Sequence, residues 1–139
     1  MKKTIIALGF AVMLTGSAFA QKLSADKVPA NVKAKFAALY PKVTDVKWEM
    51  EKSDYEAGFK EGNTKMSVVI DTKGELKETE TAIEVSALPK AAADYLAKTY
   101  PNAKITEAAK IVDAKGKMVY EAEVNKKDIL FDAKGNLVK

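Results

Sequence analysis

The sequence contains no cysteine, no histidine and no arginine, and each absence excludes a class of protein. Without cysteine, the fold is not held by disulfides or built around thiolate metal ligands. Without histidine, there is no Ser-His-Asp triad and no imidazole ligand for zinc or copper. Without arginine, the chain lacks the guanidinium fork that reads bases and phosphates, although its formal net charge is +4. We therefore expect no cofactor, no metal site and no nucleic-acid partner.

The N-terminal residues have the composition of a secretory signal peptide. Two lysines precede an apolar run from Ile5 to Leu14, and Ala18-Phe19-Ala20 forms an A-x-A cleavage site. The apolar run is too short to span a bilayer as a membrane anchor. We expect residues 1–20 to be a signal peptide that is removed after Ala20. The product would be periplasmic or secreted and would not insert into a membrane.

A segment bracketed by prolines occurs twice, from Val28 to Pro41 and, 60 residues later, from Leu88 to Pro101. In the first copy Val32, Phe36 and Leu39 recur with the period of a helix and form one apolar face, which is weaker in the second copy. In each copy one proline suits the first helical turn and the other ends the helix. Helices this short are not stable alone in water, so each needs a sheet against its apolar side.

Alternating apolar and polar residues follow each predicted helix, which is typical of strands that are buried on one face. A more polar run from Leu76 to Glu84 is interpreted as an exposed strand or a sheet edge, and the polar residues 21–27 as a loose lead-in. The alternating runs are 46–51, 55–60 and 66–71 after the first helix, and 104–112, 118–124 and 129–131 after the second.

Three turns share the pattern D-x-K-G, at residues 71–74, 113–116 and 132–135. Aspartate opens such a turn with a side-chain bond to the backbone, and glycine supplies the positive φ. Calcium-binding loops also begin with aspartate and contain glycine. In these segments, however, lysine stands where a second oxygen ligand is needed and no acidic residue completes the cage. Hairpin turns are therefore the favoured interpretation.

The repeated order resembles the PepSY-like family of secreted bacterial proteins, which is similar in fold to the β-lactamase inhibitor protein. The motifs that carry the resemblance are x-[VL]-P-x₅₋₆-[FL]-x₃-Y-P, alternating strands with an aromatic residue, and F/I-D-x-x-G-x-L, over nearly all of residues 28–139. The resemblance implies an α+β fold. Two tandem repeats of a helix plus antiparallel strands, at about 28–84 and 87–139, would form one curved sheet with the helices on one face. It implies protein binding or inhibition, and no catalytic residue.

Two patterns raise the question of catalysis. Ser24-Ala25-Asp26-Lys27 matches S-x-x-K, but it lies near the start of the exported chain and has no K-T-G partner. Glu121 and Glu123 share one face of a predicted strand at roughly 7 Å, a separation that suits an inverting glycosidase. Nothing around them in the sequence is shaped for a sugar, and a solvated strand face accounts for both. We predict no catalytic residues and no enzymatic activity.

If helices cover one face of the sheet, the alternation assigns residues to the other face. Val69, Val119 and Leu130 are apolar in that phase, and they are either a patch for a partner or scattered exposed residues. The remaining residues in the open phase are Lys47, Glu49, Glu56, Lys60, Val112, Glu121 and Glu123. The inward phase carries Trp48, Tyr55, Phe59 and Tyr120, which suit either a core or a binding hot spot, and Ile105, Ala109 and Ile111, which are expected in the core.

The sequence thus favours a secreted or periplasmic, non-enzymatic module that binds a protein or peptide partner on the open sheet face. Inhibition of an envelope or secreted protein would be one form of that function. Val69, Val119 and Leu130 are the predicted anchors, with Lys47 and Glu121 at the rim. The alternative is a protein that binds a small molecule or a peptide in a groove between the repeats.

Overall fold

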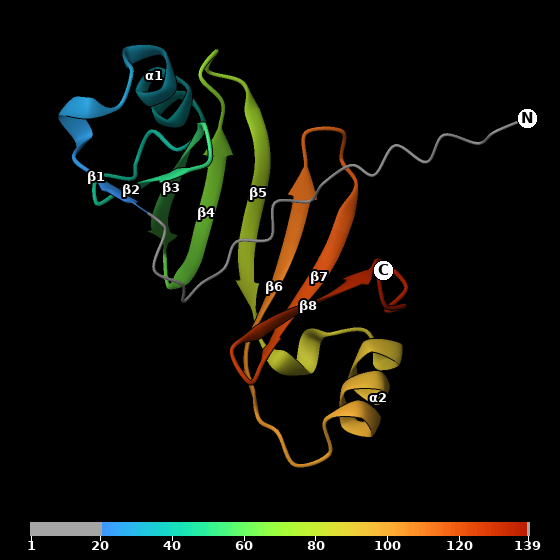
Figure 1. Cartoon of the computed structure of the whole chain (residues 1–139). Coiled ribbons are helices and arrows are strands. Elements are labelled where there is room, and N and C mark those ends of the chain that lie inside the picture. Colours follow the sequence, from blue (N-terminus) through green and yellow to red (C-terminus); the bar gives the residue numbers. More distant parts are fainter. Residues whose placement is uncertain (1–20, 139) are drawn as a thin grey trace, which may run out of the picture.

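The computed structural model describes residues 21–138, so the predicted signal peptide and its cleavage site lie outside the described residues. Eight strands form one antiparallel sheet in which the order in space follows the order in sequence, and two helices complete an α+β fold (Figure 1). The strands are β1 (Gln21–Leu23), β2 (Lys47–Glu51), β3 (Asp54–Glu61), β4 (Thr64–Ile70), β5 (Leu76–Ile83), β6 (Ile105–Asp113), β7 (Met118–Val124) and β8 (Lys127–Asp132). The helices are α1 (Ala30–Leu39) and α2 (Lys90–Thr99), which follow the short 3-10 turns η1 (Ala25–Lys27) and η2 (Val85–Ala87).

Both helices begin and end where the prolines predicted. Pro29 and Pro89 are the N-terminal caps, and Tyr40 and Tyr100 are the C-terminal caps. The backbone N–H of Tyr40 donates to the carbonyl of Phe36 at 2.9 Å, and the equivalent bond at Tyr100 is 2.8 Å long. At 10 residues each, the helices depend on tertiary packing for stability. Neither helix in the described part of the chain is long and apolar enough to cross a membrane.

Helix α1 packs on β2, β3 and β4 through an aromatic cluster centred on Phe36. The ring of Phe36 lies edge-on to Trp48 at 5.6 Å and to Phe59 at 5.1 Å, measured between centroids. All three side chains are buried, and Tyr55 packs against the same cluster. The inward phase predicted for Trp48, Tyr55 and Phe59 is therefore a hydrophobic core.

Helix α2 packs on β6, β7 and β8 and forms a second core with fewer aromatic residues. Leu96 and Phe131 are buried at its centre, and Tyr120 packs against it. The two cores lie on the same side of the sheet because one row of directly paired residues joins them. That row runs through Phe59, Met66, Thr81, Lys110, Tyr120 and Phe131. In Figure 1 the two helices lie at opposite ends of the sheet.

The prediction for β6 was right for Ile105 and for the burial of Ala109 and Ile111, which are 6% and 2% exposed, but it assigned the wrong sheet face after Ile105, because the strand contains a bulge. The register shifts between Ile105 and Glu107, so one extra residue reverses the faces beyond it. Ile105 and Ala108 consequently pack in the second core, whereas Ala109 pairs with Glu121 on the opposite face. By the same shift Ile111 lies on that opposite face. Val112 was predicted for the open face but pairs with Thr79 on the helix side.

Two further expectations are corrected by the pairing of the strands. Strand β5 is central, between β4 and β6, and is not a sheet edge. Its helix-side residues Thr79 and Thr81 are polar because they belong to neither hydrophobic core. The lead-in is also ordered, since Leu23 of β1 pairs with Trp48 of β2.

Candidate functional site

The sheet face opposite the helices, called here the open face, can be built from rows of directly paired residues. No helix of residues 21–138 contributes to the two hydrophobic cores from this side. Acidic and apolar side chains are mixed across the face. The rows are Glu49–Glu56–Val69–Glu78–Asp113, Lys47–Gly58–Ser67–Glu80–Ile111–Val119–Asp132, Ala82–Ala109–Glu121–Leu130 and Glu107–Glu123–Asp128.

The five residues predicted to bind a partner all lie on this face, but they differ in accessibility. Lys47 is exposed and Leu130 is partly buried. Val69, Val119 and Glu121 are only 6%, 1% and 5% exposed. Lys47 and Leu130 are therefore the most accessible of the five, while the two valines form the floor of the face.

A cluster of carboxylates dominates the electrostatics of the open face. Burial, together with repulsion from Glu80, Asp128 and further carboxylates, raises the pKa of Glu121 to about 8. Burial and neighbouring carboxylates also raise the pKa of each of three other glutamates to about 7, and they raise the pKa of Asp128. The three glutamates are Glu56, Glu78 and Glu80.

Several of these carboxylates have a buried oxygen without a hydrogen-bond partner. Glu78 is 8% exposed and its Oε1 has no partner, and Glu121 is 5% exposed with its Oε2 in the same situation. Glu80 Oε2 and Asp128 Oδ1 are likewise buried and unpartnered. A buried carboxylate without a donor destabilises the fold, because it loses its hydrogen bonds to water and forms none within the protein. Buried carboxyl groups with strongly raised pKa values are found more often at functional sites than elsewhere.

A hollow of about 470 Å³ opens in the middle of this carboxylate cluster, and we call it the acidic hollow. Ala82 of β5 and Ala109 of β6 are paired across the strands, and their short side chains leave the space. The hollow also lies where the half of the sheet under α1 meets the half under α2. Its polar lining includes Glu56, Lys65, Ser67, Glu80, Thr106, Glu107 and Glu121.

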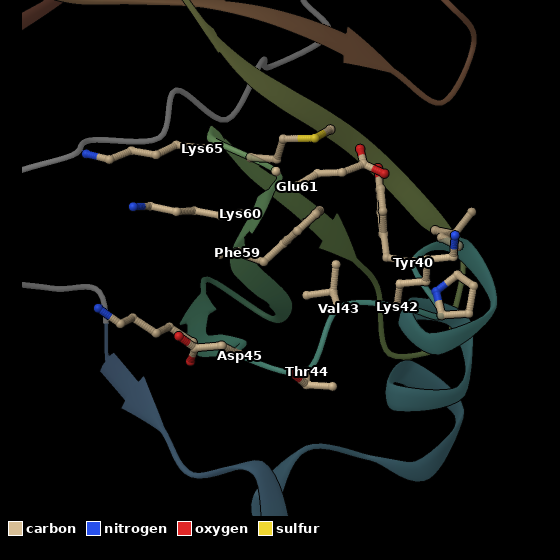
Figure 2. Close-up of a pocket in the computed structure, with 15 residues that line it drawn as sticks. Tyr40, Lys42, Val43, Thr44, Asp45, Phe59, Lys60, Glu61 and Lys65 are labelled. Carbon is tan, nitrogen blue, oxygen red and sulfur yellow. The ribbon is translucent and has the colours of Figure 1, made fainter.

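A second, larger hollow of about 980 Å³ lies between the end of α1 and the β3–β4 hairpin. Figure 2 shows Tyr40 and Lys42 on one side of this hollow, while Lys60 and Lys65 extend away from Tyr40 on the other side. Lys60 and Lys65 are directly paired across β3 and β4. This hollow is thus lined by four lysines together with Asp45 and Glu61, whereas the acidic hollow has a single lysine among its carboxylates.

The described residues contain no group of three or more acidic side chains arranged to hold a metal ion. The aspartates of the D-x-K-G turns bind their own backbone, as predicted. Asp71 Oδ1 accepts the N–H groups of Lys73 and Glu75, both at 2.9 Å, and Asp113 and Asp132 make equivalent pairs of bonds.

Sequence analysis found Glu56, Glu121 and Glu123 on the open face but missed the rest of the cluster. Glu78 and Glu80 were missed because β5 was interpreted as a sheet edge. Glu107 was missed because the bulge in β6 reverses the faces after Ile105. A cross-strand alignment that places β5 between β4 and β6 would have found Glu78 and Glu80.

Comparison with known proteins agrees with this architecture. The chain matches the family model described as "Putative beta-lactamase-inhibitor-like, PepSY-like" over residues 17–78 and 53–139, and it belongs to that family. No curated protein sequence matches it.

Three similar solved structures come from Bacteroides species. A DUF2874 family protein from Bacteroides uniformis has 22% identity and a TM-score of 0.71, with 81% of this chain and 87% of that chain covered. A "putative periplasmic" protein from Bacteroides eggerthii has 18% identity and a TM-score of 0.72, with 81% and 86% covered. A BLIP-like protein from Bacteroides fragilis has 21% identity and a TM-score of 0.59, with 80% and 83% covered. These likenesses show the fold.

Proposed function

We propose that this protein is a periplasmic, non-enzymatic binding module that docks a protein partner on the open face. The observation that carries the proposal is the set of buried, unpartnered carboxylate oxygens on a sheet face where no described helix packs. Apolar Val69, Val119 and Leu130 lie among them in the rows of the sheet. Val69 and Val119 are already buried in the sheet face, so a partner that covered the face would bury Leu130 and supply donors to the carboxylates. Family membership and the similar "putative periplasmic" protein support the compartment and the absence of catalysis.

The fold that presents this face is, in our proposal, a tandem repeat of one helix-plus-strands unit, at about 28–84 and 87–139. The caps of the two helices support it. Pro29 and Pro89 have φ/ψ of −56°/146° and −55°/144°, and Tyr40 and Tyr100 have −131°/65° and −128°/61°. Two copies side by side would extend the sheet and give a surface broad enough for a protein partner. Inhibition of a secreted or envelope enzyme would be one outcome of such docking.

Site-specific photocrosslinking in the cell envelope tests the docking surface. A photoreactive phenylalanine analogue replaces Lys47 or Leu130 on the open face, and Ala38 or Lys98 on the outer sides of α1 and α2 in matched controls. We expect discrete crosslinked adducts from the two open-face positions and none from the helix positions. Adducts from the helix positions alone, or from no position, would contradict the proposal.

A second candidate function is the binding of a small molecule or free peptide between the two halves of the sheet. The acidic hollow favours it, because the hollow lies where the halves meet and its volume of about 470 Å³ suits a small ligand. Under this alternative, crosslinking yields no protein adduct, while a small cationic compound shifts the amide resonances of Ala82 and Ala109.

A further inference from the structure

The acidic hollow is large enough to receive one long side chain. Its volume of about 470 Å³ is at the lower end for ligand pockets. Ala82 is exposed although it lies near the centre of the eight-stranded sheet, so the hollow opens to the outside above it. Ala109, its direct partner, pairs on its other side with Glu121. A narrow apolar floor therefore leads to a carboxylate wall.

The wall is acidic, and two of its buried side-chain oxygens have no hydrogen-bond partner. The side chain of Glu121 is buried, and its Oε2 has no hydrogen-bond partner. Glu80 has a buried, unpartnered oxygen as well, and both residues line the hollow together with Glu107. Lys65 is the one cationic side chain among the lining residues that the structure describes, and it is exposed. The hollow thus lacks a buried cation with N–H donors.

We propose that the acidic hollow receives a lysine or arginine side chain of the protein that docks on the open face. The aliphatic stem would lie over Ala82 and Ala109, and the cationic head would donate to Glu80, Glu107 and Glu121. The inference rests on the proposed function, since it assigns the chemistry of the partner's anchoring residue. A metal ion fits the hollow less well, because the described residues contain no set of three or more acidic side chains arranged to hold a metal ion.

Charge complementarity is the argument for a cationic group. Each charged neighbour that acts on the Glu121 carboxyl is itself a carboxylate, so repulsion and burial act together against ionisation. A cation in the hollow would relieve both effects and favour the ionised form. Binding should therefore release protons and tighten as the pH rises. The charged groups around Glu121 are Glu56 on β3, Lys65 on β4, Glu78 and Glu80 on β5, Glu107 on β6, Glu123 on β7 and Asp128 on β8.

The test uses the purified protein and short extended peptides, acetyl-Ala-Val-X-Val-Ala-amide, in which X is lysine, arginine or norleucine. Norleucine keeps the length of the lysine stem and removes the charge. Titration is followed by NMR at the amides of Ala82, Ala109 and Glu121, at about pH 6 and about pH 8.5. We expect the lysine and arginine peptides to bind about tenfold more tightly than the norleucine peptide, and more tightly at the higher pH.

Two variants locate the binding. Ala82→Phe fills the hollow and leaves its charges in place, with Ala97→Phe on the exposed side of α2 as the matched control. Glu121→Gln removes a carboxylate and leaves the shape in place, with the exposed Glu84→Gln as its control. We expect each hollow variant to bind the lysine peptide about tenfold more weakly than the wild type, and the controls to bind it as tightly as the wild type. Thermal melts show whether each variant is folded, and Glu121→Gln keeps the test valid if Ala82→Phe is not.

The outcomes separate this inference from the function on which it rests. If the lysine, arginine and norleucine peptides bind equally well while the probes at positions 47 and 130 still crosslink a partner, the cationic anchor is wrong and the proposed docking face stands. If open-face crosslinks are absent but the lysine peptide and free spermidine bind alike, the hollow takes a small cation and both proposals fail. If millimolar Ca²⁺ displaces the lysine peptide and loses its effect in Glu121→Gln, the hollow is a metal site and the anchor is overturned.

Discussion

Gly135 lies directly against Pro89, so that a Cβ atom added to the glycine would be 2.8 Å from the Cβ of the proline. The same added atom would lie 2.9 Å from the backbone N of Ala92, and Gly135 has φ +87°. The turn after β8 is therefore pressed on the first turn of α2. The turn after β4 has the same relation to α1, where Asn31 Nδ2 donates to the carbonyl of Thr72 at 2.9 Å. Two of the three D-x-K-G turns, at residues 71–74 and 132–135, therefore hold strand ends against helices as well as reversing the chain.

Gly135→Ala should therefore destabilise the protein more than the same change at Gly116. Gly116 also has positive φ, but nothing lies within 4 Å of its added Cβ, so it reports the backbone cost alone. We expect a loss of about 1–2 kcal/mol for Gly116→Ala and about 3 kcal/mol for Gly135→Ala in urea unfolding. Equal losses would mean that the contact with Pro89 contributes nothing.

The aspartate that opens the last turn makes stability sensitive to acid. Backbone N–H groups of Asn136 and Lys134 donate to Asp132 and lower the pKa of its carboxyl. Because the folded pKa is lower than the unfolded one, this stabilisation is present above the unfolded pKa and is lost as the pH falls through the folded pKa. Asp132→Ala should lower the melting temperature at neutral pH and lose its difference from the wild type in acid.

Two further variants give the controls for Asp132. Asp132→Asn retains an oxygen acceptor, so it should melt above Asp132→Ala and show less dependence on acid. Asp94→Ala removes an exposed carboxylate that pairs with Lys90 on α2, and it should change the melting temperature little. A melting temperature for Asp132→Asn as low as that of Asp132→Ala would show that the turn depends on charge and not on hydrogen bonding.

Phe36 should be the most costly residue of α1 to truncate, since its ring contacts Tyr40, Trp48 and Phe59. Phe36→Ala leaves a cavity in the first core and should cost about 3–5 kcal/mol in chemical denaturation. Leu39 lies in the same helix but is 39% exposed, so Leu39→Ala should cost less than about 1 kcal/mol. Similar losses for the two variants would argue against the aromatic cluster as the support of α1.

The sequence predicted the features that depend on neighbouring residues. Proline placement fixed both helices to within a residue, and period-two alternation placed Trp48 and Phe59 in the core, because both signals act over a few positions. The D-x-K-G turns were predicted for the same reason. What alternation did not reveal was the bulge after Ile105, because one extra residue leaves no compositional mark.

The central position of β5 was also beyond a local interpretation. A polar run is usual at a sheet edge. Thr79 and Thr81 instead lie in the middle of the sheet, between the two hydrophobic cores, and neither residue belongs to a core. Because Glu80 lies on this strand, the acidic hollow can be recognised only once β5 is paired with β4 and β6. The candidate site is a product of register, which is set by long-range pairing.

The carboxylates of the open face should make the protein less stable as the solution becomes alkaline. Burial and like charges raise the pKa of Glu121 from 4.5 to about 8. The folded state therefore binds more protons than the unfolded state between these values, and the free energy of unfolding falls as the pH rises through this range. Glu121→Gln removes the penalty. It should raise stability by about 1–3 kcal/mol at about pH 9 and change it little at about pH 4.

Urea unfolding at several pH values measures this effect, with the exposed Glu84→Gln as the control that should follow the wild-type profile. A gain in stability would also show that the loss of peptide binding expected for Glu121→Gln does not come from unfolding. If Glu121→Gln loses stability at pH 9, then the carboxylate makes a favourable contact in the free protein. In that case the repulsion among Glu78, Glu80 and Glu121 is not the source of the pH dependence.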